Sequence, residues 1–405
     1  MTTTMGSPLG PTRILDMTWW GVGPCCTLLL GFLGAEVIKI EHRDRLDPER
    51  RRYTKPGTVS VNMGPLFNDW NLNKFSLEVN LRHPEGAEVV RRLAAVSDVV
   101  VDNFSPGVMN RLGLGYDRLR KTKPDIIMLS LSALGSTGPE SNAVGVAPTF
   151  AALSGLATVG LTPNGFPFEF RGATDLTVSM MGALAVLGAL NRRLTTGRGE
   201  FLDVAAAETL ASMAGEAFLD HSLGQRLPPV IGNKDRFIAP HNLYPCRGDD
   251  AWISIAVVTN EEWRALCGVI GREDMANDAR FADAQGRKQH EEHIDEVIAD
   301  FTRGRDKKEL MKLFQEVGVA AMPSFSSQDL CEDPHLAERG CIQTIQHPEA
   351  GCVVCLRPPW AFSRTPASIV RPAPLLGEHT DRYLQELLGI DSAALARLRV
   401  EKALV

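Results

Sequence analysis

The chain has 405 residues, 44% of them hydrophobic, which is typical of a soluble globular enzyme and enough for two or more hydrophobic cores. Its formal net charge of -6 excludes a broadly basic nucleic-acid-binding surface but allows a local basic pocket for an anionic ligand. The N-terminus lacks the basic start and apolar run of a signal peptide, and no segment predicts a membrane-spanning helix. We therefore expect a cytoplasmic protein that binds neither membranes nor nucleic acid.

The first part of the chain alternates between strand and helix patterns. Apolar runs predict buried strands at residues 13–18, 35–41, 98–104 and 125–134. Helices are predicted at residues 24–34, 84–97 and 106–114. This alternation predicts an α/β fold with a Rossmann-like, doubly wound parallel sheet, on which ligands bind at the carboxyl ends of the strands. The loop segments 19–24 and 103–107 are expected at that edge.

A carboxylate, Asp175, stands at the beginning of a long apolar run that predicts a helix. An aspartate in this position commonly accepts hydrogen bonds from the first free N–H groups of the helix. Taken alone, the spacing favours a helix cap over a catalytic group.

The composition of the sequence changes at residues 227–246, which are rich in Pro and turn formers. We therefore place a domain boundary near residue 226. Residues 251–325 predict a strand, several amphipathic helices and a return, a pattern that suits a smaller α+β domain. Residues 351–390 predict a further strand followed by a helix.

Motifs of several other protein classes are incomplete. Gly21 and Gly23 follow the first strand as in a dinucleotide-binding loop, but the third glycine is missing and Pro24 interrupts the motif, which disfavours a nicotinamide cofactor. The segment HEEH at 290–293 has the wrong spacing for a zinc protease, and CVVC at 352–355 lacks a second pair, so no metal site is predicted. The eight cysteines are expected to be small buried side chains in a reducing compartment.

The order of several segments resembles the class III CoA-transferases, a family that includes formyl-CoA transferase, carnitine CoA-transferase and α-methylacyl-CoA racemase. The resemblance covers nearly the whole chain. It is carried by GPCCTLLLGFLGAEVIKIE, NKFSLEVNL, DVVVDNFSPGVMNRLGLGYDRL, LSALGSTGP, ALSGL, TGRGEFLDVAAAE, EEWRALC, EDPHLAERG and PLLGEHT. Each fragment is short, but together they follow the order and spacing of the family.

The resemblance implies a ring-like subunit in an interlocked dimer, either a homodimer or a heterodimer with a paralogous subunit. A large CoA-binding domain would be built from residues 1–225 and from residues 331–405, which include a return linker, and a smaller domain from residues 226–330. The resemblance also implies that no cofactor is tightly bound, because an acyl-CoA thioester and a free carboxylic acid are the substrates.

Asp175 falls where these transferases carry their nucleophilic aspartate, and the resemblance therefore reverses the preference for a cap. Its carboxylate would attack the acyl-CoA thioester to give an aspartyl anhydride, and the released CoA thiolate would then form an aspartyl-CoA thioester. A helix N-terminus is compatible with this role because it favours the ionised carboxylate and fixes its direction.

The resemblance also assigns contacts with CoA. They are Trp19, Trp20, Gly21 and Val22 in the first loop, His42, Val79 at a strand end, and Asn103, Phe104, Val108 and Arg111 in the segment NFSPGVMNR. His42 stands where formyl-CoA transferase has an Arg. The helix start within 103–107 is suited to receive a phosphate through backbone N–H groups, with Arg111 adding charge.

Two departures from the family patterns bear on the reaction. Formyl-CoA transferase has Gln at the position of Gly21, and its glycine-rich loop is replaced here by residues 231–240, so formate and oxalate are disfavoured as substrates. The racemase carries a catalytic His at the position of Val146. An α-methylacyl-CoA racemase or isomerase would therefore lack one of its two expected catalysts, and it is the second candidate function.

Aromatic residues suggest an apolar wall beside the site, namely Trp19, Trp20, Phe168 and Phe170. We therefore hypothesise transfer of CoA from succinyl-CoA to a bulky organic or dicarboxylic acid, with aromatic acids such as benzylsuccinate included. A non-catalytic subunit of a two-subunit transferase is a third candidate, which the presence of Asp175 disfavours.

Overall fold

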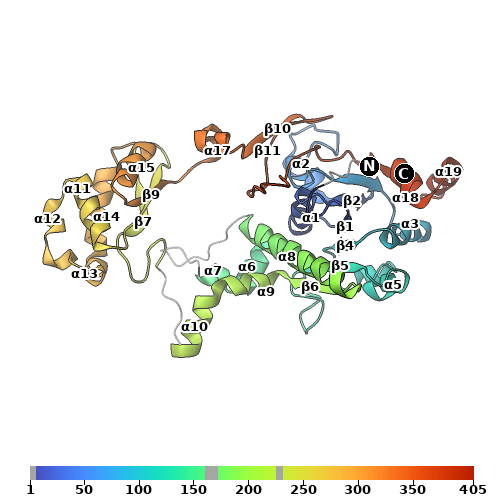
Figure 1. Cartoon of the computed structure of the whole chain (residues 1–405), viewed down its shortest axis with the longest axis horizontal. Helices are drawn as coiled ribbons and strands as arrows, with labels where there is room; N and C mark the ends of the chain where they lie inside the picture. Colours follow the sequence, from blue (N-terminus) through green and yellow to red (C-terminus); the bar gives the residue numbers. More distant parts are fainter. Residues whose placement is uncertain (1–5, 160–171, 225–230) are drawn as a thin grey trace. The chain divides into compact units, whose positions relative to one another are not determined.

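The computed structural model of the protein describes residues 6–159, 172–224 and 231–405 (Figure 1). The chain divides into two compact units, and each is described by itself. Unit 1 comprises Met1–Thr158, Glu169–Arg226 and His335–Val405, and unit 2 comprises Val159–Phe168 and Leu227–Pro334. Unit 1 therefore contains both ends of the chain together with Asp175.

A six-stranded parallel sheet forms the centre of unit 1, with the strand order β3-β2-β1-β4-β5-β6. Its strands are β1 (Arg13–Met17), β2 (Glu36–Glu41), β3 (Phe75–Glu78), β4 (Val99–Asp102), β5 (Ile127–Ser132) and β6 (Phe201–Ala205). The predicted α/β fold with a doubly wound parallel sheet is confirmed. The direction of strand order reverses between β1 and β4, which is the point where such sheets bind ligands outside their carboxyl ends.

Two hydrophobic cores lie on opposite faces of this sheet because successive strand residues point to opposite sides. Leu15 and Ile38 belong to the first core, whereas their neighbours Ile14 and Val37 belong to the second. The first core packs against α3 (Pro84–Ala95), α5 (Tyr116–Thr122), α18 (Thr380–Leu388) and α19 (Ser392–Val400), and the second against α1 (Val22–Phe32), α8 (Ala173–Thr196) and α9 (Ala206–Ala211). The other helices of unit 1 are α2 (Pro65–Trp70), α4 (Val108–Arg111), α6 (Ala147–Leu153) and α10 (Gly215–Gly224), and α7 (Leu156–Val159) begins in this unit.

Helix α8 is long and apolar enough to pass a length and hydropathy test for a membrane span, which the sequence analysis does not anticipate. The side chains of Val178, Val186 and Leu190 are nevertheless buried in the second core of unit 1. A buried core helix has the same apolar composition as a membrane helix, because both exclude water. The helix is therefore weak support for a membrane location.

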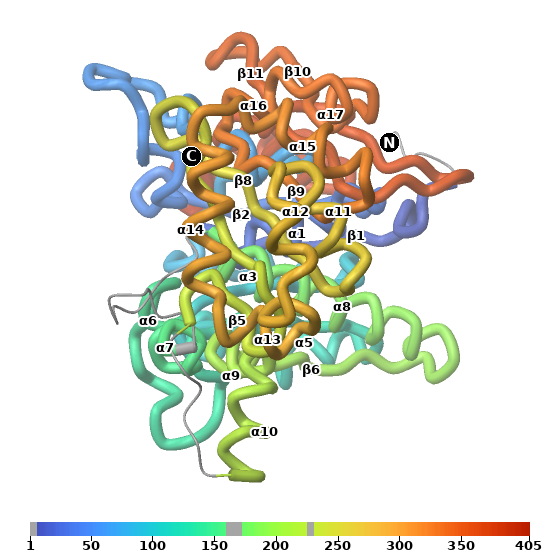
Figure 2. Tube along the Cα trace, turned by 90° about the vertical axis from the view of Figure 1, so that its left-hand side faces the viewer, coloured from blue at the N-terminus to red at the C-terminus, as the bar shows by residue number. Residues whose placement is uncertain are grey.

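The returning segment of unit 1 differs from the expectation of one further strand. It forms an antiparallel hairpin of β10 (Ile342–His347) and β11 (Gly351–Leu356), whose strands lie side by side in both views (Figures 1 and 2). The expectation that all cysteines are buried is wrong for Cys331 and Cys352, which are exposed, and for Cys341, which is half-buried. All eight cysteines lie in the described part of the chain and are free thiols.

Unit 2 is built on a three-stranded antiparallel sheet in the order β7-β8-β9, with β7 (His241–Pro245), β8 (Trp252–Ala256) and β9 (Ala320–Pro323). Its helices are α11 (Asn260–Ile270), α12 (Glu273–Ala276), α13 (Ala284–Gln289), α14 (Glu291–Thr302), α15 (Lys307–Glu316) and α16 (Ser327–Glu332), and α17 (Pro334–Glu338) follows in the chain. Trp263, Tyr244, Phe281 and Phe314 are the large aromatic side chains of its buried core. This arrangement is an α+β fold of the kind that the sequence predicts for this region.

Candidate active site

The loops that follow β1 to β4 bring predicted CoA-binding residues to the carboxyl edge of the sheet in unit 1. Residues 19–22 follow β1, His42 follows β2, Val79 follows β3, and Asn103 and Phe104 follow β4. Parallel strands place their carboxyl ends on one edge, so segments that are far apart in the sequence are gathered there. Their contact with CoA stays a prediction.

Asp175 is the third residue of α8 and lies against the loop that follows β1. A Cβ atom built on Gly21 would be 2.5 Å from Oδ2 of Asp175, so only a glycine leaves room for the carboxylate in this position. The hydroxyl of Ser179, one turn further along α8, lies 2.7 Å from the carbonyl oxygens of both Asp175 and Val22, to which it donates. These contacts join α8 to the start of α1.

The carboxylate of Asp175 lies near the N-termini of two helices, because Gly21 is the residue that precedes α1 and Asp175 belongs to the first turn of α8. Helix N-termini carry partial positive charge and favour an ionised carboxylate. Burial raises the pKa of the neighbouring Cys25 thiol to about 12, and the charge of Asp175 acts in the same direction. The thiol is therefore neutral and does not compete with the carboxylate as a nucleophile.

The loop after β1 is held in an unusual conformation. Asn103 Oδ1 accepts a hydrogen bond from the N–H of Trp19 (2.9 Å), and Asn103 Nδ2 donates to the Trp19 carbonyl (2.7 Å). The next residue, Trp20, has a φ of 62°, a left-handed conformation that costs a bulky residue about 1–3 kcal/mol and persists only where its surroundings enforce it. Asn103 is thus a positioning residue for this loop, and its direct contact with CoA stays a prediction.

An aromatic and cationic cluster covers part of the same edge. The ring of Trp19 meets that of Phe104 edge-on at 5.4 Å between centroids, and the Arg45 guanidinium lies 5.0 Å from the Trp19 centroid. Trp20 presents more surface than Trp19, with 47% of it exposed. Arg45 is absent from the sequence prediction because an isolated Arg in a charged segment has no distinguishing pattern, yet an exposed Arg here suits a phosphate of CoA.

The other predicted CoA contacts are placed less favourably. Val79 is fully buried in the first core, so its side chain packs inward. His42 Nδ1 accepts a hydrogen bond from the Asp44 N–H (3.3 Å). Val108 and Arg111 form the ends of α4, which has four residues and is shorter than the predicted helix at 106–114. So short a helix has a small macrodipole and attracts a phosphate only weakly. The exposed guanidinium of Arg111 is therefore the main positive charge that this segment offers to a phosphate.

Two further sequence predictions concern the surroundings of the site. Phe168 and Phe170 lie outside the described residues. Val146 directly precedes α6 and is 58% exposed. Among the residues that the structure describes, no group of three or more His, Cys, Asp or Glu side chains is arranged to hold a metal ion.

A second carboxylate, Asp102, lies buried at the end of β4. Its Oδ1 accepts hydrogen bonds from the N–H of Phe104 (3.1 Å) and the hydroxyl of Ser130 (3.4 Å), whereas Oδ2 finds no hydrogen-bond partner among the described residues. Burial raises the pKa of Asp102 to about 7, and these two hydrogen bonds oppose the rise only in part.

The contribution of Asp102 to stability is expected to fall as the pH rises from about 4 to about 7, because the folded chain keeps the Asp102 proton that the unfolded chain releases near its usual pKa of 3.8. The free energy of unfolding of wild type relative to Asp102→Asn should drop by at most about 4 kcal/mol over this range. Urea unfolding of both proteins at several pH values measures this difference. Asp98→Asn, just before β4, is the control. If the free energy of unfolding of wild type relative to Asp98→Asn fell equally with pH, the assignment to Asp102 would be contradicted.

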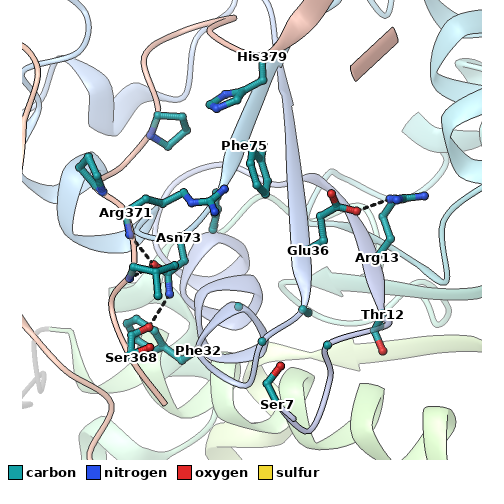
Figure 3. Close-up of a pocket in the computed structure, with 18 of the residues that line it drawn as sticks. Ser7, Thr12, Arg13, Phe32, Glu36, Asn73, Phe75, Ser368, Arg371 and His379 are labelled. Atoms are coloured by element: carbon teal, nitrogen blue, oxygen red, sulfur yellow. Dashed lines mark hydrogen bonds and ion pairs between the residues drawn. The ribbon is translucent and has the colours of Figure 1, made fainter. Parts of the chain in front are cut away.

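A cavity of about 650 Å³ lies within unit 1 at the opposite edge of the sheet, beside the residues that begin β1, β2 and β3 (Figure 3). Arg13 there pairs with Glu36 at 2.5 Å, and the guanidinium of Arg371 lies 4.0 Å from the centroid of the Phe75 ring. None of the residues predicted to bind CoA lines this cavity. The amino edge is therefore separate from the candidate active site.

Comparisons with known proteins match the chain over almost its entire length. The model of CoA-transferase family III matches residues 9–380. The beta subunit of succinyl-CoA–L-malate CoA-transferase from Chloroflexus aurantiacus is 31% identical over 99% of this chain and 99% of that protein. Succinyl-CoA:glutarate CoA-transferase from Mus musculus is 29% identical over 96% of this chain and 89% of that protein.

Among solved structures, a CaiB/BaiF family protein from Brucella suis superposes with a TM-score of 0.85. It is 26% identical to this chain, and the alignment covers 94% of this chain and all of that protein.

Proposed function

This chain belongs to CoA-transferase family III, and we propose that it transfers CoA from succinyl-CoA to an organic acid through a covalent intermediate on Asp175. The observation that supports this most directly is the carboxylate of Asp175 against Gly21, at the edge where parallel sheets bind ligands. Relatives named for L-malate and glutarate are described as using succinyl-CoA, which supports the same donor here.

The proposed reaction has two symmetrical halves. Asp175 attacks the thioester carbonyl of succinyl-CoA, the C–S bond breaks, and a mixed anhydride and CoA thiolate form. The thiolate attacks the aspartyl carbonyl, releasing succinate and leaving an aspartyl-CoA thioester. The acceptor carboxylate then attacks this thioester, the C–S bond breaks, and a second anhydride and CoA thiolate form. The thiolate attacks the acceptor carbonyl of the anhydride, so that acceptor-CoA leaves and the Asp175 carboxylate is restored. The N–H groups at the starts of α1 and α8 are suited to stabilise the oxyanion of each step.

We propose a dicarboxylic acid as the acceptor. The relatives named for L-malate, D-citramalate and glutarate all act on dicarboxylic acids, although only two of these acids carry a hydroxyl group. An aryl dicarboxylic acid such as benzylsuccinate is the second candidate. Trp20 directly precedes Gly21, and its half-exposed ring favours this candidate because such a ring offers an apolar surface to an aromatic substituent.

A matched panel of acceptors tests the dicarboxylate. Glutarate and pentanoate have the same number of carbon atoms and differ by one carboxylate. We expect kcat/KM for glutarate to exceed that for pentanoate by about 100-fold or more, because a site built for a second carboxylate is left with unpaired polar groups by the analogue. Malate, citramalate and benzylsuccinate complete the panel, with formate and oxalate as small acids. Equal rates for glutarate and pentanoate would contradict a dicarboxylate site.

We further propose that two subunits associate, either as an interlocked homodimer or with a paralogous subunit. Leu176, Met180 and Leu184 lie at successive turns of α8 and are each exposed, and α10 carries the exposed Phe218 and Leu219. Helix α10 extends away from the rest of unit 1 in both views (Figures 1 and 2). A partner would cover these apolar side chains. Relatives named as alpha and beta subunits of one transferase support a second subunit type, and light scattering on the isolated chain measures its assembly.

A cytoplasmic location stays a proposal, supported by the composition of the chain and by CoA thioesters as substrates. The racemase alternative has no support of its own in this structure, since Val146 is an apolar residue in the position of the expected base.

A further inference from the structure

We infer that Lys39 and Asp47 are positioning residues that hold the loop of residues 18–22 in the conformation that Asp175 requires. They belong to a buried ion network, which we define as Asp16, Lys39, Glu41, Asp47, Arg50 and Lys74. The inference rests on the proposed function of Asp175, and none of the six residues is among the predicted catalytic or CoA-binding residues.

The network contacts the loop at Thr18 and at Trp20. Lys39 Nζ donates to the carbonyl of Thr18 (2.7 Å), and Asp47 Oδ1 accepts from the N–H of Trp20 (3.1 Å). Lys39 Nζ and Asp47 Oδ2 are themselves paired at 3.2 Å. One ion pair therefore holds the loop both before and after Trp19. The N–H and carbonyl of Trp19 itself are bonded by the side chain of Asn103.

Two further ion pairs complete the network. Asp16 accepts from the N–H (2.9 Å) and hydroxyl (2.6 Å) of Thr18 and is paired with Lys74 at 3.0 Å. Glu41 accepts from the backbone N–H of Asp47 (3.4 Å) and is paired with Arg50 at 2.7 Å. The side chains of all three ion pairs are fully buried.

The charges of the network balance, with three carboxylates and three cations. Burial alone would raise the pKa of Asp16, but Lys74, Lys39 and the hydroxyls of Thr18 and Thr27 outweigh it and lower the pKa to about 2. Buried ion pairs often stabilise a fold no better than apolar side chains of the same size, because desolvation offsets their attraction. What apolar side chains would not supply is a donor and an acceptor aimed at the loop backbone.

Trp20 is the residue that needs such support. Its left-handed backbone, with φ at 62°, sets the direction in which the chain enters Gly21, and Gly21 is the residue against which the carboxylate of Asp175 lies. A small displacement of a reacting group lowers catalysis steeply. Loss of the Asp47 acceptor would release the Trp20 N–H and let this backbone relax to a commoner conformation.

The test uses the full chain, with any partner subunit that it requires, and measures the rate at which succinyl-CoA modifies Asp175 in a single turnover. We expect Asp47→Ala and Lys39→Met to slow this step by about 30- to 100-fold. Asp47→Asn keeps an oxygen that accepts from Trp20, and we expect it to recover at least about tenfold of that loss. The KM for succinyl-CoA should change much less than the modification rate.

Arg50→Met is the matched control. Arg50 bonds Glu41 and Asn62 and stacks on Phe67, none of which belongs to the loop, so this variant breaks an equally buried pair without releasing Trp20. We expect its Tm to fall while its modification rate stays within about threefold of wild type at temperatures well below Tm. A loss of rate equal to that of Asp47→Ala would overturn the inference.

A double variant covers the case in which the single variants fail to fold. Lys39→Met with Asp47→Val replaces the ion pair by apolar side chains, and we expect it to fold with a Tm near that of wild type yet to react as slowly as Asp47→Ala. A double variant that reacts at the wild-type rate would refute the positioning role.

Hydrogen exchange of the amides of residues 18–22 separates this inference from the proposed function. We expect faster exchange of the Trp20 amide in Asp47→Ala than in Arg50→Met, whether or not Asp175 reacts. Faster exchange together with an unmodified wild-type chain would refute the covalent role of Asp175 and support the positioning of the loop. Unchanged exchange in Asp47→Ala would refute the positioning role itself.

Discussion

Replacing Asp175 by Asn is expected to lower kcat for CoA transfer from succinyl-CoA by on the order of 10³-fold or more, because the covalent route loses its nucleophile. An amide has nearly the shape of the carboxylate but does not form the anhydride, so the fold around Gly21 should be retained. The measurement is intact mass after incubation with succinyl-CoA and then hydroxylamine or borohydride. Wild type should carry a trapped modification that Asp175→Asn lacks.

The control separates a nucleophile from a helix cap. Asp329 is the third residue of α16, as Asp175 is of α8, and it accepts from the N–H of Ser326 before the helix. Removing an acid from the first turn of a helix costs about 0.3–1 kcal/mol, so both Asp→Asn variants should lose a little stability. Only Asp175→Asn should lose activity.

Two outcomes would contradict the covalent role of Asp175. An Asp175→Asn variant that keeps more than about a tenth of the wild-type kcat would assign Asp175 to the helix cap, because a lost nucleophile removes far more. If wild type exchanges the α-proton of an acyl-CoA and no modification is trapped, the racemase reaction is favoured, with Asp175 as an acid/base catalyst.

The parallel sheet could be predicted because β1, β2, β4 and β5 are largely buried on both faces and therefore read as apolar runs. The strand β3 has only four residues, of which two are polar, and its pairing with β2 rather than its own pattern makes it a strand. The hairpin of β10 and β11 is likewise defined by pairing, since only two of its twelve residues are buried and its apolar residues do not indicate which segment pairs with which. Pairing between distant segments is a tertiary property that local patterns do not contain.

The candidate site was harder to predict than the fold. An aspartate that caps a helix and one that attacks a thioester have the same local pattern, so the proposal of Asp175 as the nucleophile depends on resemblance to a family and not on spacing. The contact between Asp175 and Gly21 joins two distant segments and is visible only in the structure. Lys39 offered a signal, because a charged residue in the middle of the apolar run EVIKIE needs a buried partner. That partner, Asp47, stands in a charged loop segment where nothing in the sequence distinguishes it.

Gly21→Ala is expected to slow the modification of Asp175 by about 100-fold with little change in stability. The φ of Gly21 is -91°, which alanine adopts freely, so the backbone is not strained by the substitution. The added Cβ would come within 2.5 Å of Oδ2 and 3.1 Å of Cγ of Asp175. Because these atoms end a flexible side chain, we expect the carboxylate to turn out of its position while the backbone stays in place. Single-turnover modification and thermal unfolding measure the two effects separately.

Gly188→Ala is the control, because Gly188 lies in the interior of α8 and a Cβ built there meets no atom within 4 Å. Alanine favours a helix over glycine by about 1 kcal/mol, so this variant should raise Tm and leave the reaction unchanged. Gly21→Ala should instead leave Tm nearly constant and slow the reaction. A Gly21→Ala variant that modifies Asp175 at the wild-type rate would mean that the carboxylate reaches the thioester from a direction that this loop does not define. A large fall in its Tm would instead show that Gly21 serves the packing of α1 against α8.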